Sequence, residues 1–295
     1  MKWPVMPSGQ APHPARGILL VVLATLLFAS HDALAKYLSG FYPVILVVWV
    51  RYVVHSLLMA GIFLPRAGLR MLRTRRPGLQ LLRAICLLGT SLLFVSSLQF
   101  IPLAAATAVN FLAPVLVTAL SVPLLGERVS MGQWVAVSLG FFGVLVIVHP
   151  GGELFTPAIL LPLGSALCFA LYQLLTRKLS EFDGPSTSNL LAGLFATVVL
   201  STLMPLFWQP LALQHLPLLL ALGVLGMLAH LLLTQSFRHA PPALLAPFGY
   251  CQIIFAGALG LLLFDSRPDR SVLLGTALIC LGGLAAAWLQ RRASR

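Results

Sequence analysis

A histidine and a carboxylate stand side by side inside a long apolar run, at His31 and Asp32 of the segment FASHDALAKYLS, residues 28–39. Histidine loses its proton near neutral pH, and a carboxylate in an apolar segment is costly unless it is paired, hydrated or functional. The segment recurs 141 residues later as FALYQLLTRKLS, where Tyr172 and Gln173 take the two polar places. These four side chains are our first candidates for proton transfer and for contact with a polar solute.

Asp32 needs a partner, because it is the only one of seven acidic residues that falls inside an apolar span. Lys36 lies one helical turn away, and Arg51 lies in the next apolar segment. We favour Arg51, because the long stem of Lys36 can carry its ammonium to water at the outer interface. The pair then either locks two helices together or forms a switchable contact beside a cavity. His31 likewise is either a hydrogen-bonded packing residue or part of a site.

Other polar side chains are scattered through the apolar segments. Each of them can bond to a neighbouring helix, for about 0.6 kcal/mol, but together they are typical of a polar cavity that takes an organic solute. The predicted substrate-binding residues are His31, Asp32, Arg51, Asn110, Tyr172, Gln173, His230, Tyr250 and Gln252.

The composition excludes several functional classes. Of 295 residues, 59% are hydrophobic and 9% are charged, against about 25% charged in soluble domains, so the chain is predicted to work in the lipid bilayer. Its net charge of +12 is spread over short connections, whereas nucleic-acid binders gather basic residues on one surface. We find no catalytic, cofactor or metal-binding motif. We therefore expect no nucleic acid, no cofactor and no metal.

A helix that spans the bilayer needs about 20 apolar residues. By this criterion we expect ten spans, at residues 17–38, 43–64, 79–101, 104–125, 131–149, 157–178, 187–207, 217–237, 242–264 and 271–289. The ends of the chain, residues 1–16 and 290–295, are predicted to be tails. The fold class is an all-α polytopic membrane protein.

The orientation follows from the positively charged connections, which stay in the cytoplasm. With the N-terminus inside, 14 Lys and Arg residues fall on the cytoplasmic side and 2, Arg267 and Arg270, on the other. Both termini are therefore predicted to be cytoplasmic.

The two halves of the chain, residues 17–149 and 157–289, read as repeats of five helices each. A unit with an odd number of spans enters the membrane from the opposite side the second time, so the repeats are predicted to be inverted. The fifth and tenth helices carry small residues at i,i+4, which permit close helix contact. The residues are Ala136 with Gly140 and Gly282 with Ala286. We expect a scaffold there, or the seam of a homodimer.

Ten helices in two inverted halves, Pro114 in the fourth helix, the LLGER segment at 124–128 and glycine-rich fifth and tenth helices resemble the EamA-type branch of the drug/metabolite transporter superfamily. The chain departs from that pattern at Asp265, where the family usually has Glu, and at Gln252, near an expected proline. The resemblance implies transport of a small metabolite across a bacterial inner membrane.

We therefore expect a secondary transporter or facilitator of a small polar metabolite that works by alternating access of the two halves. The alternative is a membrane-embedded enzyme or a non-transporting assembly subunit. An enzyme should gather its titratable groups near one interface, whereas the polar residues here are spread over both halves around the midplane.

Overall fold

The computed structural model describes residues 14–68, 72–125, 130–149, 152, 154–179, 182–236, 239, 245 and 248–293. Over these residues the regular structure is entirely helical. The main helices are α1 (Pro14–Leu38), α2 (Val44–Ala67), α3 (Pro77–Ser97), α4 (Leu103–Asn110), α5 (Ala113–Leu125), α6 (Met131–Ile147), α7 (Leu160–Leu179), α8 (Pro185–Phe207), α9 (Leu216–Ser236), α11 (Cys251–Phe264) and α12 (Arg270–Ala293).

Each of the ten predicted spans contains helix in the described part of the chain. Seven helical segments are long and apolar enough to cross a membrane. Three further apolar helices are shorter, at Met131–Ile147, Cys251–Phe264 and Arg270–Ala285. These lengths and hydropathies indicate a multi-pass membrane protein, while the count of ten spans stays a prediction.

Proline interrupts the fourth predicted helix, which we expected to be continuous over 104–125. The structure divides it into α4 and α5, with Phe111 and Leu112 in a turn. Pro114 has no N–H to donate to the carbonyl of Asn110, and its ring clashes with that carbonyl. A new helix therefore starts at Ala113.

The ends of several helices also differ from the prediction. Within the predicted span 242–264 the structure describes helix α11 only from Cys251, after a turn at Tyr250. α1 already begins at Pro14, inside the predicted tail, whose residues 1–13 lie outside the described residues. At the other end, α12 continues to Ala293, because its apolar pattern passes into basic residues without a helix-breaking residue.

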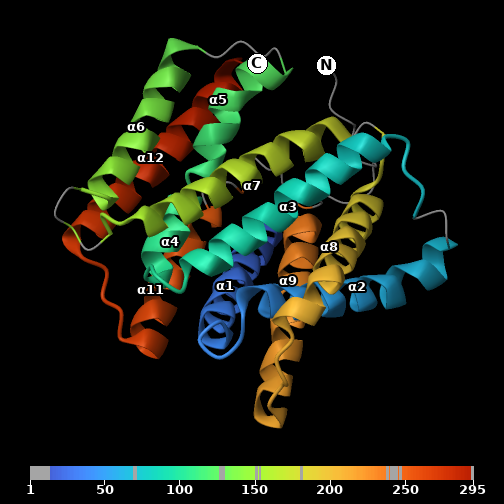
Figure 1. The fold of residues 1–295 in the computed structure, drawn as a ribbon. Coiled ribbons are helices and arrows are strands. Elements are labelled where there is room, and N and C mark those ends of the chain that lie inside the picture. Colours follow the sequence, from blue (N-terminus) through green and yellow to red (C-terminus); the bar gives the residue numbers. More distant parts are fainter. Residues whose placement is uncertain are drawn as a thin grey trace.

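The helices pack in pairs that join the two halves of the chain. Figure 1 shows α6 and α12 side by side, next to α5, while α3 and α7 run together across the middle of the molecule. α1 packs against α9 and α11, and α2 packs against both α8 and α9. α3 also contacts α8, and α7 also contacts α5 and α4. Almost every extensive contact therefore links a helix of the first half to one of the second.

α6 and α12 approach each other at glycines. A Cβ at Gly143 would lie 2.7 Å from the carbonyl oxygen of Gly275, and a Cβ at Gly282 would lie 2.7 Å from the carbonyl oxygen of Ala136 and 2.8 Å from the nitrogen of Gly140. Only glycine permits this backbone contact. The small residues thus serve packing within one chain, as the scaffold interpretation expects. The homodimer stays a prediction.

Large apolar side chains cover much of the outer surface. Leu57, Leu220, Ile254, Leu262 and Leu274 are each more than half exposed. A soluble monomer rarely exposes so many large apolar residues, whereas hydrocarbon tails would cover them. The interior is also apolar, with alanine, leucine and valine prominent.

Candidate functional site

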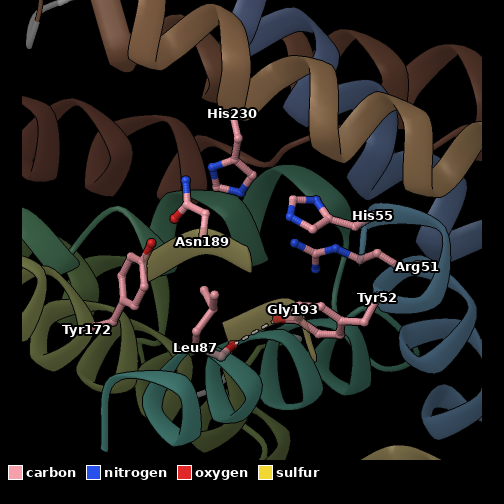
Figure 2. A pocket seen from close by; sticks show the side chains of 8 residues that line it. All are labelled: Arg51, Tyr52, His55, Leu87, Tyr172, Asn189, Gly193 and His230. Carbon is pink, nitrogen blue, oxygen red and sulfur yellow. Dashed lines mark hydrogen bonds between the residues drawn. The ribbon is translucent and has the colours of Figure 1, made fainter. Parts of the chain in front are cut away.

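A narrow pocket lies where five helices from both halves of the chain meet. Its lining residues are Arg51, Tyr52 and His55 from α2, Leu87 from α3, Tyr172 from α7, Asn189 and Gly193 from α8, and His230 from α9. Figure 2 shows Tyr172 and Asn189 on one side, the α2 residues on the other, and His230 next to them. The side chains leave room for little more than a water molecule. The pocket is therefore nearly closed in this conformation.

Arg51 is held at the pocket by α2 and α3. Its Nη1 donates to Ser91 Oγ at 3.2 Å, and its guanidinium lies 5.2 Å from the centre of the Tyr52 ring. The Tyr52 hydroxyl is also bonded to Ser91 Oγ, at 2.7 Å. Ser91 and Tyr52 thus hold one side of the guanidinium, and its remaining N–H groups are directed to the pocket.

Arg83 of α3 is almost completely buried, and its guanidinium lies 4.5 Å from the centre of the Tyr172 ring. Its Nη2 donates to Tyr172 Oη at 2.8 Å and to Asn189 Oδ1 at 3.1 Å. Its Nε donates to Thr176 Oγ1 at 2.6 Å, and its Nη1 donates to the carbonyl of Ser188 at 2.8 Å. Arg83 therefore fixes two pocket-lining side chains and joins α3 to α7 and α8.

Three histidines gather around Arg51. The rings of His55 and His230 are 6.4 Å apart, and His230 also meets Phe28 edge to face at 4.9 Å. His31 and Arg51 both lie against Gly226 of α9. A Cβ at Gly226 would be 3.4 Å from His31 Cδ2 and 3.8 Å from Arg51 Nε, so the two side chains are neighbours. His31 and His230 were predicted as binding residues, and the structure brings both into this region.

Asp32 does not pair with Arg51, so that prediction is wrong. His31 Nδ1 is 3.0 Å from Asp32 Oδ1, and Gln252 Nε2 of α11 donates to Asp32 Oδ2 at 3.0 Å. Among the described residues, His31 with Asp32 is the one pair of potentially opposite charge within 4 Å. The prediction failed because a place in the next apolar segment says nothing about the face of the helix on which the Arg51 side chain lies.

Lys36 is not left in water either. Its Nζ donates to the carbonyl oxygens of Leu98 and Ile101, the latter at 3.1 Å, and it lies 5.5 Å from the centre of the Phe264 ring. These carbonyls have no helical partner because α3 ends there. Lys36 thus joins α1 to the α3–α4 turn.

Six of the nine predicted binding residues do not line this pocket; they are His31, Asp32 and Gln252, described above, and Asn110, Tyr250 and Gln173. Asn110 Oδ1 accepts a hydrogen bond from Ser165 Oγ at 2.9 Å, so it joins α4 to α7. The Tyr250 ring lies tilted against that of Phe111, with ring centres 5.3 Å apart, and its buried hydroxyl has no hydrogen-bond partner among the described residues. Gln173 is half-buried on α7.

A cluster of polar side chains lies at one end of the molecule, beyond the pocket. Asp183, between α7 and α8, accepts hydrogen bonds from Thr74 Oγ1, from the N–H of Arg75 at 3.1 Å and from Gln80 Nε2 at 2.9 Å. Partial burial alone would raise the pKa of this carboxyl, but the hydrogen bonds from Thr74, Gln80 and Arg75 outweigh it and lower the pKa. Gln80 also donates to Ser188 Oγ at 2.8 Å.

At the opposite end, the α1–α2 turn meets the segment between α8 and α9. Tyr42 Oη is 2.9 Å from His215 Nδ1 and accepts a hydrogen bond from the N–H of Ala212 at 3.0 Å. Gln99 Nε2 donates to the carbonyl of Ser39 at 3.0 Å. The pocket thus lies between two polar clusters, each of which joins the two halves of the chain.

The EamA-like transporter family matches the sequence twice, over residues 15–149 and over residues 156–287. The chain belongs to this family. Membership confirms the resemblance to EamA-type drug/metabolite transporters and, with the apolar helices, identifies a multi-pass integral membrane protein.

Relatives of this EamA protein align over nearly their whole length. A riboflavin transporter of Vibrio cholerae is 31% identical over 91% of this chain and 92% of that protein. An S-adenosylmethionine uptake transporter of Rickettsia bellii is 25% identical, over 94% and 95% of the two chains. A pseudopaline exporter of Pseudomonas aeruginosa is 29% identical, over 91% and 95%. A solved crystal structure shares the fold, with a TM-score of 0.64 and 22% identity over 95% of this chain and 99% of that one.

Sequence reasoning missed several residues that line or support the pocket of this EamA protein. Arg83, His55 and Asn189 were not among the predicted binding residues. One signal was available, since Arg83 is a charged residue inside an apolar segment and such residues are rare unless they are functional. Asn189 gave no such signal, because it follows the serines and threonines of a helix start.

Proposed function

We propose that this protein is a secondary transporter or facilitator that carries a small polar metabolite through the pocket by alternating access. The observation that carries the proposal is the composition of the pocket lining. Polar side chains of α2 lie there opposite polar side chains of α7, α8 and α9. A solute bound between helices of two halves can face either side of the membrane when the halves rock.

The pattern of helix contacts supports an inverted repeat around this pocket. In the two repeats α1 corresponds to α7, α2 to α8 and α3 to α9. When corresponding helices are exchanged, the α1–α9 contact becomes the α7–α3 contact, and the α2–α9 contact becomes the α8–α3 contact. Both members of each pair are present, while α2–α8 and α6–α12 map onto themselves. The lining residues follow the same relation, because Arg51 and Asn189 are 138 residues apart and so are His55 and Gly193. The pocket then lies at the axis that relates the repeats.

The two polar clusters are suited to act as gates. The cluster around Asp183 and the cluster around Tyr42 each consist of a few hydrogen bonds between the halves. Alternating access requires that one cluster opens while the other stays closed. We place the Asp183 end in the cytoplasm, in a bacterial inner membrane, because the basic connections are on that side.

The names of the relatives support an organic metabolite as substrate. They are named for riboflavin, S-adenosylmethionine and pseudopaline, and they include both uptake transporters and an exporter. These relatives are named as transporters or as an exporter, which favours transport over the alternatives of an enzyme or an assembly subunit.

The test is solute flux in liposomes that contain only this protein. Liposomes are loaded with the small-molecule extract of the producing cells, and efflux is measured for wild type, His31→Ala and Tyr172→Phe, with and without an imposed pH gradient. We expect wild-type liposomes to release specific metabolites, and the two variants to do so more slowly. Release equal to that of empty liposomes contradicts transport. Indifference to the gradient would assign facilitated diffusion.

A further inference from the structure

Two arginines lie beside the pocket, and their hydrogen bonding differs. A guanidinium has five N–H donors. Arg83 makes four hydrogen bonds, which engage all three of its nitrogens. Arg51 makes a single hydrogen bond to another described residue, a 3.2 Å contact with Ser91. The protein therefore satisfies Arg83 and leaves most of the donors of Arg51 toward the pocket.

Nothing acidic in the described part of the chain neutralises Arg51. None of the four described carboxylates, those of Asp32, Asp183, Asp265 and Asp269, lies within 4 Å of it. Asp32, the one within a span, is taken up by His31 and Gln252. The pocket lining is composed of an arginine, two histidines, an asparagine, two tyrosines, a leucine and a glycine. It thus has positive charge and hydrogen-bond donors but no acid.

A charged side chain inside a membrane protein is costly, by about 2.5–3.5 kcal/mol on insertion scales, and normally faces a partner or a functional cavity. Arg51 lines a cavity, and none of the described carboxylates lies within 4 Å of it. A planar guanidinium binds carboxylate and phosphate oxygens through two parallel hydrogen bonds. Tyr52 and Ser91 already fix its orientation.

We propose that Arg51, with His55 and His230 beside it, binds an anionic group of the transported metabolite, either a carboxylate or a phosphate. The inference rests on the proposed function and names the class of its substrate. Asn189 and Tyr172, on the far side of the pocket and held there by Arg83, contact the uncharged polar part of the same molecule. The negative charge of the substrate neutralises the positive charge of Arg51, so the substrate is bound and Arg51 is neutralised in the same step.

The test uses the full chain in lipid nanodiscs, and its probe is the small-molecule extract of the cells that produce the protein. Metabolites retained after washing are identified by mass spectrometry and compared with those retained by empty nanodiscs. We expect wild type to retain a metabolite with a carboxylate or phosphate group, and Arg51→Gln to lower its retention about 30-fold or more, as when one member of a buried charge pair is removed. The identity of the metabolite distinguishes carboxylate from phosphate.

Two further variants separate binding from folding and from net charge. Arg51→Lys keeps the charge but loses the planar fork, so its retention should fall between those of wild type and Arg51→Gln. Arg16→Gln removes the same charge at an exposed position of α1 and should retain the metabolite as wild type does. If Arg51→Gln aggregates, Arg51→Lys is compared with wild type instead. Equal retention of the metabolite by Arg51→Lys and wild type would then count against the proposal.

The remaining outcomes are distinct. If wild type retains only neutral or cationic metabolites, or if Arg51→Gln retains the anionic ones as well as wild type does, the inference is wrong and the proposed function stands. If wild type retains nothing beyond empty nanodiscs, the proposed function itself is contradicted, and this inference with it.

Discussion

Gln252 Nε2 donates a hydrogen bond to Asp32 Oδ2 at 3.0 Å and so joins α11 to α1 across 220 residues of sequence. The second oxygen of Asp32 is 3.0 Å from His31 Nδ1. Both oxygens of this buried carboxylate therefore have a polar partner, one from its own helix and one from α11. Among the described residues, His31 Nε2 has no hydrogen-bond partner.

The Gln252–Asp32 bond should contribute to stability. Gln252→Leu removes the donor and leaves a buried carboxylate oxygen unsatisfied, which costs about 1–3 kcal/mol. We expect a lower melting temperature of the purified protein in detergent, and less than additive loss when Gln252→Leu is combined with Asp32→Asn. Gln173→Leu is the matched control, because Gln173 occupies the place of Asp32 in the second repeat and has no hydrogen bond among the described contacts. Equal losses in the two leucine variants would contradict the assigned bond.

The glycines between α6 and α12 give a second prediction. Gly282→Ala places a Cβ within 3 Å of backbone atoms of α6, which cannot move aside cheaply. Such overpacking costs about 1–3 kcal/mol. Gly257→Ala is the control, because its Cβ would meet its nearest neighbour, Ala104, at an ordinary 3.9 Å. We expect thermal unfolding at a lower temperature for Gly282→Ala, and an unchanged or higher one for Gly257→Ala. A lower unfolding temperature for Gly257→Ala than for Gly282→Ala would show that α6 and α12 do not approach each other as closely as described above.

Asp183 gives a prediction about pH. Because its pKa is lowered in the folded protein, its contribution to stability is complete above the unfolded value of about 3.9 and is lost as the pH falls through the lower folded pKa. Asp183→Asn should therefore lower the melting temperature by about 2–4 °C at pH 5–8. The difference between wild type and variant should shrink below about pH 4. A difference that is constant down to pH 3 would mean that the carboxylate is not held by Thr74, Gln80 and Arg75.

Orientation is the subject of the fourth prediction. The charge bias predicts that Arg75 is cytoplasmic and that Asp269 is external. Reporter domains fused after these two residues should be active on those sides, and the Thr74–Asp183 contact requires that the connection after α7 lies on the same side as Arg75. A fusion pair with the opposite labelling would place the Asp183 cluster outside the cell.

The broad architecture was accessible from sequence, because the length of apolar runs depends only on the thickness of the bilayer. The break at Phe111 was also within reach, since Pro114 was noted but not applied to helix continuity. The partners of Asp32 were not, because they depend on which helices meet and on the rotation of each helix. α1 meets α9 and α11 along its length, and nothing in the sequence of α1 specifies that contact.

The pocket illustrates the same limit. Arg51 and His230 were predicted from residue type, and Tyr172 from its place in the repeat, all of which can be read from the sequence alone. Arg83 and Asn189 take part through bonds between α3, α7 and α8. The sequence places these residues 106 apart, and only packing brings them together.

The last prediction compares the two arginines of the pocket. Arg83→Gln should destabilise the protein strongly, by about 2–5 kcal/mol, because it leaves Thr176, Tyr172, Asn189 and the carbonyl of Ser188 without their donor. Arg51→Gln removes a charge that the described residues do not neutralise, so the melting temperature should stay the same or rise. Transport in liposomes should be lost for Arg51→Gln in spite of its stability. Equal destabilisation by the two substitutions would show that Arg51 is a structural residue, and would remove the reason for placing it in the site.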